Sequence, residues 1–146
     1  HLFLIREPRE MLTSLMKQIP HPTLEDTGLP QQVELLGELK AIGKMPLVLD
    51  SKDILQYPES TLSITCVKLG VDFDESMLNW PSGPRKSDGV WAPHWYASVE
   101  ASTSFAKWKP KEERVPAHLE SLCLECEALY SVLKEEKLER TNVTEV

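Results

Sequence analysis

The chain of 146 residues lacks any run of about twenty apolar residues, the length that a helix needs to cross a bilayer. It also lacks a surplus of positive charge, because 16 Lys and Arg stand against 23 Asp and Glu and the net charge is -7. Broad binding to nucleic acid or to an anionic membrane needs a basic surface, so this charge argues against both partners. A small anionic ligand needs only a local basic pocket and remains compatible with it.

Cysteine is scarce, and its three residues are an odd number that cannot form the complete disulfide framework of a small secreted module. We therefore favour an intracellular, soluble protein and leave the compartment open. Cys123 and Cys126 form a single CxxC pair, which supplies too few ligands for a structural zinc site. A redox pair normally opens a helix after a strand, whereas this pair falls within a helical apolar stripe. Buried structural thiols are the favoured interpretation.

Several signatures of catalysis are absent as well. The sequence contains neither a GxxxxGK[ST] phosphate loop nor a GxSxG nucleophile motif. The four His residues are scattered without the spacing of metal ligands, and we predict no metal site. His94 stands near Trp91 and Trp95, and packing is its favoured role. Asn142-Val-Thr144 matches an N-glycosylation pattern, but nothing else indicates secretion.

Length and composition, with 41% apolar and 27% charged residues, are those of one globular domain. We place this domain at residues 1–138 and a polar tail at 139–146. The chain begins with His rather than Met, so we expect a fragment or a processed product.

The apolar runs at residues 1–5 and 45–49 are predicted to be buried strands. Four segments are predicted to be helices, because apolar residues recur at helical spacing and Pro or Gly stands at several of their ends. These are residues 8–19, 31–42, 58–69 and 116–138, and 94–104 is predicted to form a shorter helix. The order indicates an α/β fold with a parallel sheet. Two strands are too few to close its core, so we expect upstream sequence or a partner chain to complete the sheet.

The first candidate site is the junction between the first predicted strand and the following helix. Arg6 ends the strand, and Ser14 lies eight residues further, about two turns into the helix. Ligands of open α/β sheets bind beyond the carboxyl ends of the strands. An Arg there and a hydroxyl on the next helix can converge on one phosphate. The alternative, which the spacing alone favours, is a salt-bridged Arg and a surface Ser.

The second candidate lies in the Trp-containing loop at residues 79–93, which is long enough to indicate a functional loop. Arg85, Lys86 and Ser87 offer hydrogen-bond donors there beside Gly83 and Gly89, where backbone can approach a ligand closely. Two cations in such a loop suit an anion. The alternative, which the pattern alone favours, is a solvated basic turn.

Together these two segments resemble the PAPS-dependent sulfotransferases, whose donor is 3′-phosphoadenosine 5′-phosphosulfate. The run FLIREPREMLTS is similar to their 3′-phosphate-binding segment, and Arg6 and Ser14 match its Arg and Ser. The run GPRKSDGVW is similar to a later segment in which Arg, Lys and Gly precede Gly-Asp-Trp. Arg85 and Lys86 match the basic pair, while Ser87 stands in the place of the Gly.

A closer resemblance covers nearly the whole chain. The run LGVDFDESMLNWPSGPRKSDGVWAPHWYASVEASTSF is similar to the sulfotransferase-like domain of a P-loop family. In plants this domain occurs in branched-chain aminotransferase-like proteins. Its markers here are Leu69-Gly70, Phe73, Met77-Leu78, Trp80, Gly83-Pro84, residues 88–92, Trp95-Tyr96 and Ser102-Thr103.

This resemblance implies the C-terminal portion of a P-loop NTPase-type parallel sheet with flanking helices. The family's first strand and its phosphate loop lie upstream of the segment that begins here, and so does the His that serves as catalytic base in ordinary sulfotransferases. None of the four His residues here takes that role by position, so the catalytic residues are unknown.

The expected activity of the complete protein is transfer of a sulfuryl group from PAPS to an acceptor hydroxyl or amine. The resemblance assigns PAPS binding to Arg6, Ser14, Arg85, Lys86 and Ser87, and this chain alone is expected to be inactive. The alternative is a non-catalytic subunit with a structural or binding role in an assembly. The expected partner is accordingly a small-molecule acceptor or a protein that completes the sheet. A nucleotide hydrolase fits poorly, because no Walker lysine is visible.

Overall fold

The structure, a computed structural model, describes residues 1–90, 92 and 96–139. The chain divides into two compact units. Unit 1 contains residues 1–53 together with the chain from residue 109 onward, and unit 2 contains residues 54–108. Trp91, His94, Trp95 and the sequence at 142–144 lie outside the described residues, so the expectations placed on them stay predictions.

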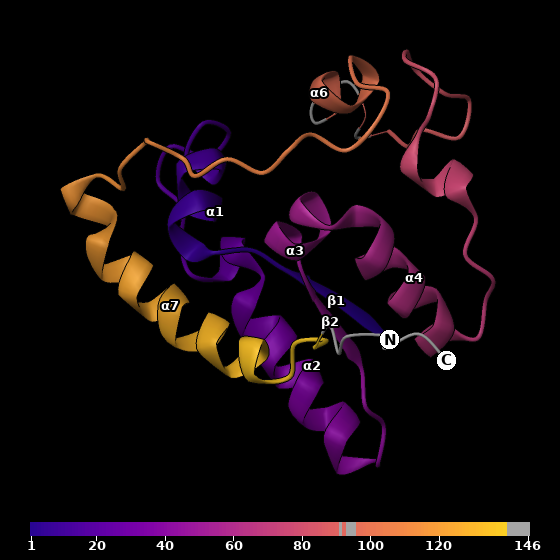
Figure 1. Cartoon of the computed structure of the whole chain (residues 1–146). Coiled ribbons are helices and arrows are strands. Elements are labelled where there is room, and N and C mark those ends of the chain that lie inside the picture. Colours follow the sequence, from indigo (N-terminus) through magenta and orange to yellow (C-terminus); the bar gives the residue numbers. More distant parts are fainter. Residues whose placement is uncertain (91, 93–95, 140–146) are drawn as a thin grey trace. The chain divides into compact units, whose positions relative to one another are not determined.

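Unit 1 follows the predicted order of strand, helix, helix, strand and a long final helix (Figure 1). Its elements are β1 (Leu2–Ile5), α1 (Pro8–Leu15), η1 (Glu25–Thr27), α2 (Leu29–Ala41), β2 (Leu47–Asp50), η3 (Ala117–Leu119) and α7 (Glu120–Glu135), where η marks a 3-10 helix. The helix α3 (Ser51–Gln56) follows β2 directly and leads into unit 2. The sequence did not predict it.

The two strands pair in parallel, with Ile5 opposite Asp50 at their carboxyl ends. Helices α1 and α2 form the long crossover that parallel neighbours require. The prediction of an α/β fold with a parallel sheet is therefore confirmed. Leu138 N donates to Val48 O over 2.8 Å at the other edge of β2. Within the described residues no strand pairs with the outer edge of β1, and the expectation that further chain completes the sheet stays a prediction.

The core of unit 1 lies on one face of this sheet, where α7 lies along α1 and α2 and contacts both strands (Figure 1). Successive strand residues point to opposite faces, so Phe3 and Ile5 are buried while Leu2 and Leu4 are 44% and 54% exposed. The core joins these strand residues to buried side chains of the helices. Its buried members are Phe3, Ile5, Leu12, Leu29, Leu36, Leu39, Val48, Cys123, Cys126, Tyr130 and Leu133.

The helix ends differ from the predictions in four places. Helix α2 runs from Leu29 to Ala41 rather than over the predicted 31–42, with Pro30 in its first turn. Helix α1 starts at Pro8 as predicted but ends at Leu15, because the chain turns at residues 16–18 before Pro20. Helix α7 is shorter than the predicted 116–138, since the chain after Pro116 first forms η3. The short helix predicted at 94–104 is described only as α6 (Ala97–Glu100).

Unit 2 contains α4 (Pro58–Leu69), η2 (Glu75–Leu78) and α6. Helix α4 has its predicted bounds, because Pro58 fits the first helical turn and Gly70 takes the left-handed φ of 70° that ends it. Trp80 packs against the end of the following loop. Its ring contacts the ring of Phe105 edge to face, with the ring centroids 5.2 Å apart. Its indole nitrogen donates to Ser102 Oγ over 3.1 Å.

Candidate functional site

Arg6 follows the last residue of β1, at the edge of the sheet where both strands end. Its side chain is 39% exposed, and Nε lies 3.5 Å from Glu10 Oε2. This separation marks an ion pair rather than a short hydrogen bond. The Glu10 side chain is only 16% exposed, so the pair is open to solvent on its Arg6 side, where a phosphate could reach the guanidinium.

Ser14 lies on α1, and its hydroxyl oxygen accepts a hydrogen bond from Lys111. The ammonium nitrogen of Lys111 lies 2.5 Å from Ser14 Oγ, 3.0 Å from the carbonyl oxygen of Glu10 and 3.3 Å from Thr13 Oγ1. Positions 10, 13 and 14 share one face of a helix because they are three and four residues apart. Lys111 therefore lies over the face of α1 that carries Ser14.

Cations and carboxylates both lie near this hydroxyl. Burial, and next the neighbouring charge of Arg6, lower the pKa of Lys111 below its usual value; Lys17 acts in the same direction. Glu113 and Glu10 act in the opposite direction. Lys17 Nζ lies 2.8 Å from Glu113 Oε1, and this hydrogen bond lowers the pKa of Glu113. Charges of both signs therefore surround Ser14, and the adjoining cavity is lined by five carboxylates and three cations.

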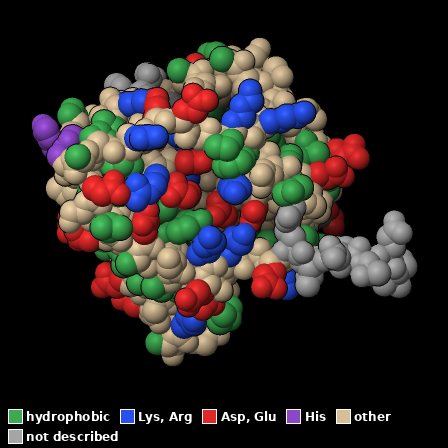
Figure 2. Space-filling view, turned by 60° about the vertical axis from the view of Figure 1, so that its left-hand side comes forward, with side chains coloured by type: hydrophobic (Ala, Val, Ile, Leu, Met, Phe, Trp, Pro, Cys, Tyr) green, Lys and Arg blue, Asp and Glu red, His purple; other side chains and the backbone are tan. Residues whose placement is uncertain are grey.

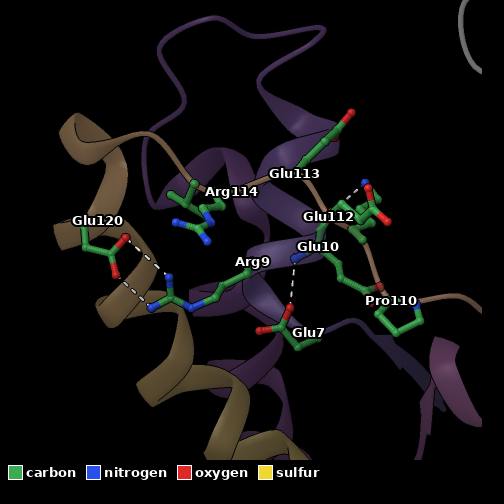
Figure 3. Close-up of a pocket in the computed structure, with 10 residues that line it drawn as sticks. Glu7, Arg9, Glu10, Pro110, Glu112, Glu113, Arg114 and Glu120 are labelled. Atoms are coloured by element: carbon green, nitrogen blue, oxygen red, sulfur yellow. Dashed lines mark hydrogen bonds and ion pairs between the residues drawn. The ribbon is translucent and has the colours of Figure 1, made fainter.

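A cavity of about 620 Å³ borders this cluster, between α1, the start of α7 and the segment at residues 110–115 (Figure 3). Figure 3 shows Arg9 reaching from α1 toward Glu120 of α7. Arg9 Nη2 lies 2.8 Å from Glu120 Oε1, and Arg9 Nε lies 2.9 Å from Glu127 Oε1. Two carboxylates therefore compensate the charge of Arg9, which makes it a poor ligand-binding candidate. The lining residues are Glu7, Arg9, Glu10, residues 110–115 and Glu120.

Sequence reasoning missed a buried polar pair at the same edge of the sheet. Tyr130 OH donates to Asp50 Oδ2 over 2.5 Å, and Asp50 Oδ1 accepts from Lys52 N over 2.8 Å. Burial, followed by the hydrogen bond to Asp50, raises the pKa of Tyr130 well above its usual value, so the phenol keeps its proton. The available signal was an Asp directly after an apolar run and a Tyr on a helical apolar stripe.

Arg85, Lys86 and Ser87 are exposed side chains of unit 2. They lie in a turn in which Arg85 N donates to Asp88 Oδ2 over 2.7 Å and Asp88 N donates to Arg85 O over 3.0 Å. Gly83 precedes the turn with a left-handed φ of 100°. Arg6 and Ser14 belong to unit 1, where Ser14 contacts Lys111 and Arg6 lies near enough to lower the pKa of Lys111. A shared role of these two residues with the exposed triplet stays a prediction.

The CxxC pair behaves as predicted. Cys123 and Cys126 are buried on α7 and neither forms a disulfide, which confirms the interpretation as buried thiols. Burial raises the pKa of Cys123 to about 11 and also raises that of Cys126. A thiol that holds its proton at neutral pH is a poor nucleophile, so neither residue belongs to the candidate site.

Within residues 1–90, 92 and 96–139, no helix is both long and apolar enough to cross a membrane. In the same ranges no three His, Cys, Asp or Glu side chains gather as metal ligands would. Figure 2 shows acidic and basic side chains interspersed over the face in view, without a broad basic patch there.

The amino-acid sequence of the chain is similar to known protein sequences over most of its length. The sequence model of the sulfotransferase domain matches residues 1–134. Branched-chain-amino-acid aminotransferase-like proteins 1 and 2 of Arabidopsis thaliana are 37% and 34% identical to the chain over 134 residues. Each match covers 92% of this chain and 24% of the relative, so the chain spans about a quarter of the length of these curated relatives. No solved structure matches the chain.

Proposed function

The chain belongs to the sulfotransferase domain family, and from that premise we propose that it supplies part of the donor site of a PAPS-dependent sulfotransferase. Bound PAPS would supply an activated sulfuryl group: an acceptor oxygen or nitrogen would bond to sulfur and lose its proton to a base outside the residues assigned here, while the bond from sulfur to the phosphate oxygen would break and release adenosine 3′,5′-bisphosphate. The acceptor is a small molecule with a hydroxyl or amine. We propose no aminotransferase activity, because the two relatives so named are about four times as long as the match.

In this proposal Arg6 and Ser14 hold the 3′-phosphate of the donor. The observation that carries it is their placement: Arg6 lies at the carboxyl edge of a parallel sheet, and Ser14 lies on the next helix in contact with the Lys111 ammonium group. The planar guanidinium can give two parallel hydrogen bonds to phosphate oxygens, and the hydroxyl can donate a third. This donor set fits a phosphate monoester.

Glu10 competes with a bound phosphate for the guanidinium of Arg6. Its carboxylate is the ion-pair partner of Arg6 at 3.5 Å, and a bound phosphate must displace it from the guanidinium. A phosphate brings more charge and more acceptor oxygens to the guanidinium than the carboxylate does, while its repulsion with Glu10 opposes the exchange. Arg6 and Ser14 therefore bind and orient the donor; they take no part in transferring the acceptor's proton.

The remaining parts of the proposal rest on the family and on unit 2. Arg85, Lys86 and Ser87 assist donor binding from their exposed turn, which leaves their side chains accessible to an anion. The parallel pair β1–β2 belongs to a P-loop type of sheet, whose phosphate loop would hold the 5′-phosphosulfate at a helix N-terminus.

The test is calorimetric titration of the native protein with adenosine 3′,5′-bisphosphate and with adenosine 5′-monophosphate, after its intact mass has been measured. The monophosphate is the matched control because it lacks only the 3′-phosphate. We expect tighter binding of the bisphosphate. Arg6→Ala should weaken that binding by about 1.5–3 kcal/mol, the range for a hydrogen bond to a charged group. Arg6→Lys should restore part of the lost affinity, since Lys keeps the positive charge but cannot give the two parallel hydrogen bonds of a guanidinium.

Two results would contradict the proposal. One is equal affinity of the parent protein for both nucleotides, and the other is unchanged bisphosphate affinity in Arg6→Ala. Either result would favour the alternative, in which the domain is a non-catalytic relative with a binding or structural role.

A further inference from the structure

We propose that Lys111 is a positioning residue of the anion site, which holds Ser14 so that the Ser14 hydroxyl donates its hydrogen to the bound phosphate. This inference rests on the proposed function and extends it to a residue that the sequence did not indicate. Lys111 lies 97 residues from Ser14 in the chain and reaches it from the segment that borders the cavity.

The hydrogen bond between Lys111 and Ser14 has only one possible direction. An ammonium group has three donors and no acceptor, so Ser14 Oγ must accept the bond from Lys111 Nζ. A hydroxyl has one hydrogen, and this bond does not use it. The Ser14 hydrogen is thereby left for an oxygen that approaches from another side.

Lys111 also occupies the carbonyl that Ser14 would otherwise use. A Ser or Thr inside a helix tends to donate back to the carbonyl four residues earlier. Thr13 does this, since its Oγ1 lies 2.9 Å from the carbonyl oxygen of Arg9. The corresponding carbonyl for Ser14 is that of Glu10, and Lys111 Nζ donates to it over 3.0 Å. Lys111 thus competes with Ser14 for this oxygen, from which Thr13 Oγ1 also lies 3.1 Å away.

The position of Lys111 itself is well defined. Its three donors meet three acceptors, on Glu10, Thr13 and Ser14, and its side chain is half-buried. Thr13 is 2% exposed and accepts from Lys111 while donating to the backbone. A donor group that is already ordered loses little freedom when a ligand binds. The geometry therefore favours a preformed hydroxyl donor at Ser14.

The test compares Lys111→Met with Lys109→Met in the native protein. Methionine keeps an apolar stem of similar length but has no donor, and Lys109 is an exposed lysine two residues earlier whose loss changes the charge equally. We expect Lys111→Met to bind adenosine 3′,5′-bisphosphate about five- to thirtyfold more weakly than the parent. Binding of adenosine 5′-monophosphate should stay within about twofold for both variants, and Lys111→Arg should restore most of the loss because Arg also only donates.

A double-mutant cycle shows whether Lys111 acts through Ser14. In a Ser14→Ala background we expect Lys111→Met to weaken bisphosphate binding by less than about threefold, since no hydroxyl remains to be oriented. If Lys111→Met weakens bisphosphate binding as much in the Ser14→Ala background as in the parent, the inference is overturned. An equal loss for both nucleotides would do the same, because it would indicate a general structural defect.

Failure of the proposed function gives a different result. If the parent protein binds both nucleotides equally, the assignment of the 3′-phosphate is wrong. The role of Lys111 is then tested by titrating the protein with inorganic phosphate while the NMR resonance of the Lys111 ammonium group is monitored. A shift in the parent that is absent in Ser14→Ala supports an anion site positioned by Lys111. No shift in the parent overturns it.

Discussion

Tyr130 donates its phenolic hydrogen to Asp50 Oδ2 across 2.5 Å, and both side chains are more than nine-tenths buried. This bond joins α7 to the carboxyl end of β2 across 80 positions of sequence. The second carboxylate oxygen accepts from Lys52 N, so both oxygens of Asp50 have donors. The edge of the sheet from which Arg6 extends is therefore fixed by a fully bonded buried carboxylate.

Removal of this phenolic hydroxyl should destabilise unit 1. In Tyr130→Phe the Oδ2 atom of Asp50 stays buried without its donor, and we expect the free energy of unfolding in urea to fall by about 1.5–3 kcal/mol. Tyr96 is an exposed tyrosine of unit 2, and Tyr96→Phe should change the same quantity by less than about 0.5 kcal/mol. Equal stability of the two variants would show that the Asp50 bond contributes nothing.

Alkaline pH should destabilise the protein through its buried acids. Burial raises the pKa of Cys123 from 9.0 to about 11 and also raises those of Cys126 and Tyr130. Each group holds its proton more tightly in the folded state, so this stabilisation is complete below the ordinary pKa and is lost as pH rises through the folded value. For Cys123 the window is pH 9 to 11, with a slope of up to about 1.4 kcal/mol per pH unit.

Urea unfolding at several pH values across that window measures the slope. Cys123→Ala is the informative comparison, because it removes one of the three groups and should leave a shallower fall in the free energy of unfolding. A slope identical to that of the parent would mean that the Cys123 thiol does not titrate differently in the folded and unfolded states.

Packing of α7 against the sheet should be the main source of stability of unit 1. Leu133 is fully buried in the core, whereas Leu124 on the same helix is 57% exposed. Leu133→Ala should lower the free energy of unfolding by about 2–5 kcal/mol, because it removes buried methyl groups and leaves a cavity. The matched variant Leu124→Ala should cost less than about 1 kcal/mol. Similar costs for the two leucines, measured by urea unfolding, would contradict the burial of this face.

The elements that the sequence predicted well are those with local signals. The apolar runs at 1–5 and 45–49 led to strands, which the structure has at 2–5 and at 47–50, the second extending to Asp50. Pro58 and Gly70 mark both ends of α4. Helix α3 was missed because it is short and buries no side chain fully. The early end of α1 was missed because apolar spacing continues to Ile19 after the chain has already turned.

For the candidate site, the positions of Arg6 at a strand end and of Ser14 on the next helix could be predicted from local spacing. Their roles in binding stay predictions. The position of Lys111 could not be predicted, since the segment at 107–114 has the composition of a solvated charged linker and its contact with Ser14 is set by tertiary structure. The Asp50–Tyr130 bond was missed for the same reason.

The exposed turn of unit 2 allows a test that separates binding from stability. Arg85 and Lys86 are exposed, and the turn is closed by backbone groups and Asp88 rather than by their side chains. Arg85→Ala and Lys86→Ala should therefore leave the free energy of unfolding within about 0.5 kcal/mol of the parent. If these cations assist donor binding, each variant should bind adenosine 3′,5′-bisphosphate more weakly in calorimetry.

The difference in bisphosphate affinity between each variant and the parent should shrink as salt is raised from 0.05 to about 0.5 M, because exposed charges are screened. Lys68→Ala, which removes an exposed charge from α4, is the matched control. Bisphosphate affinities equal to that of the control would identify the triplet as a solvated basic turn.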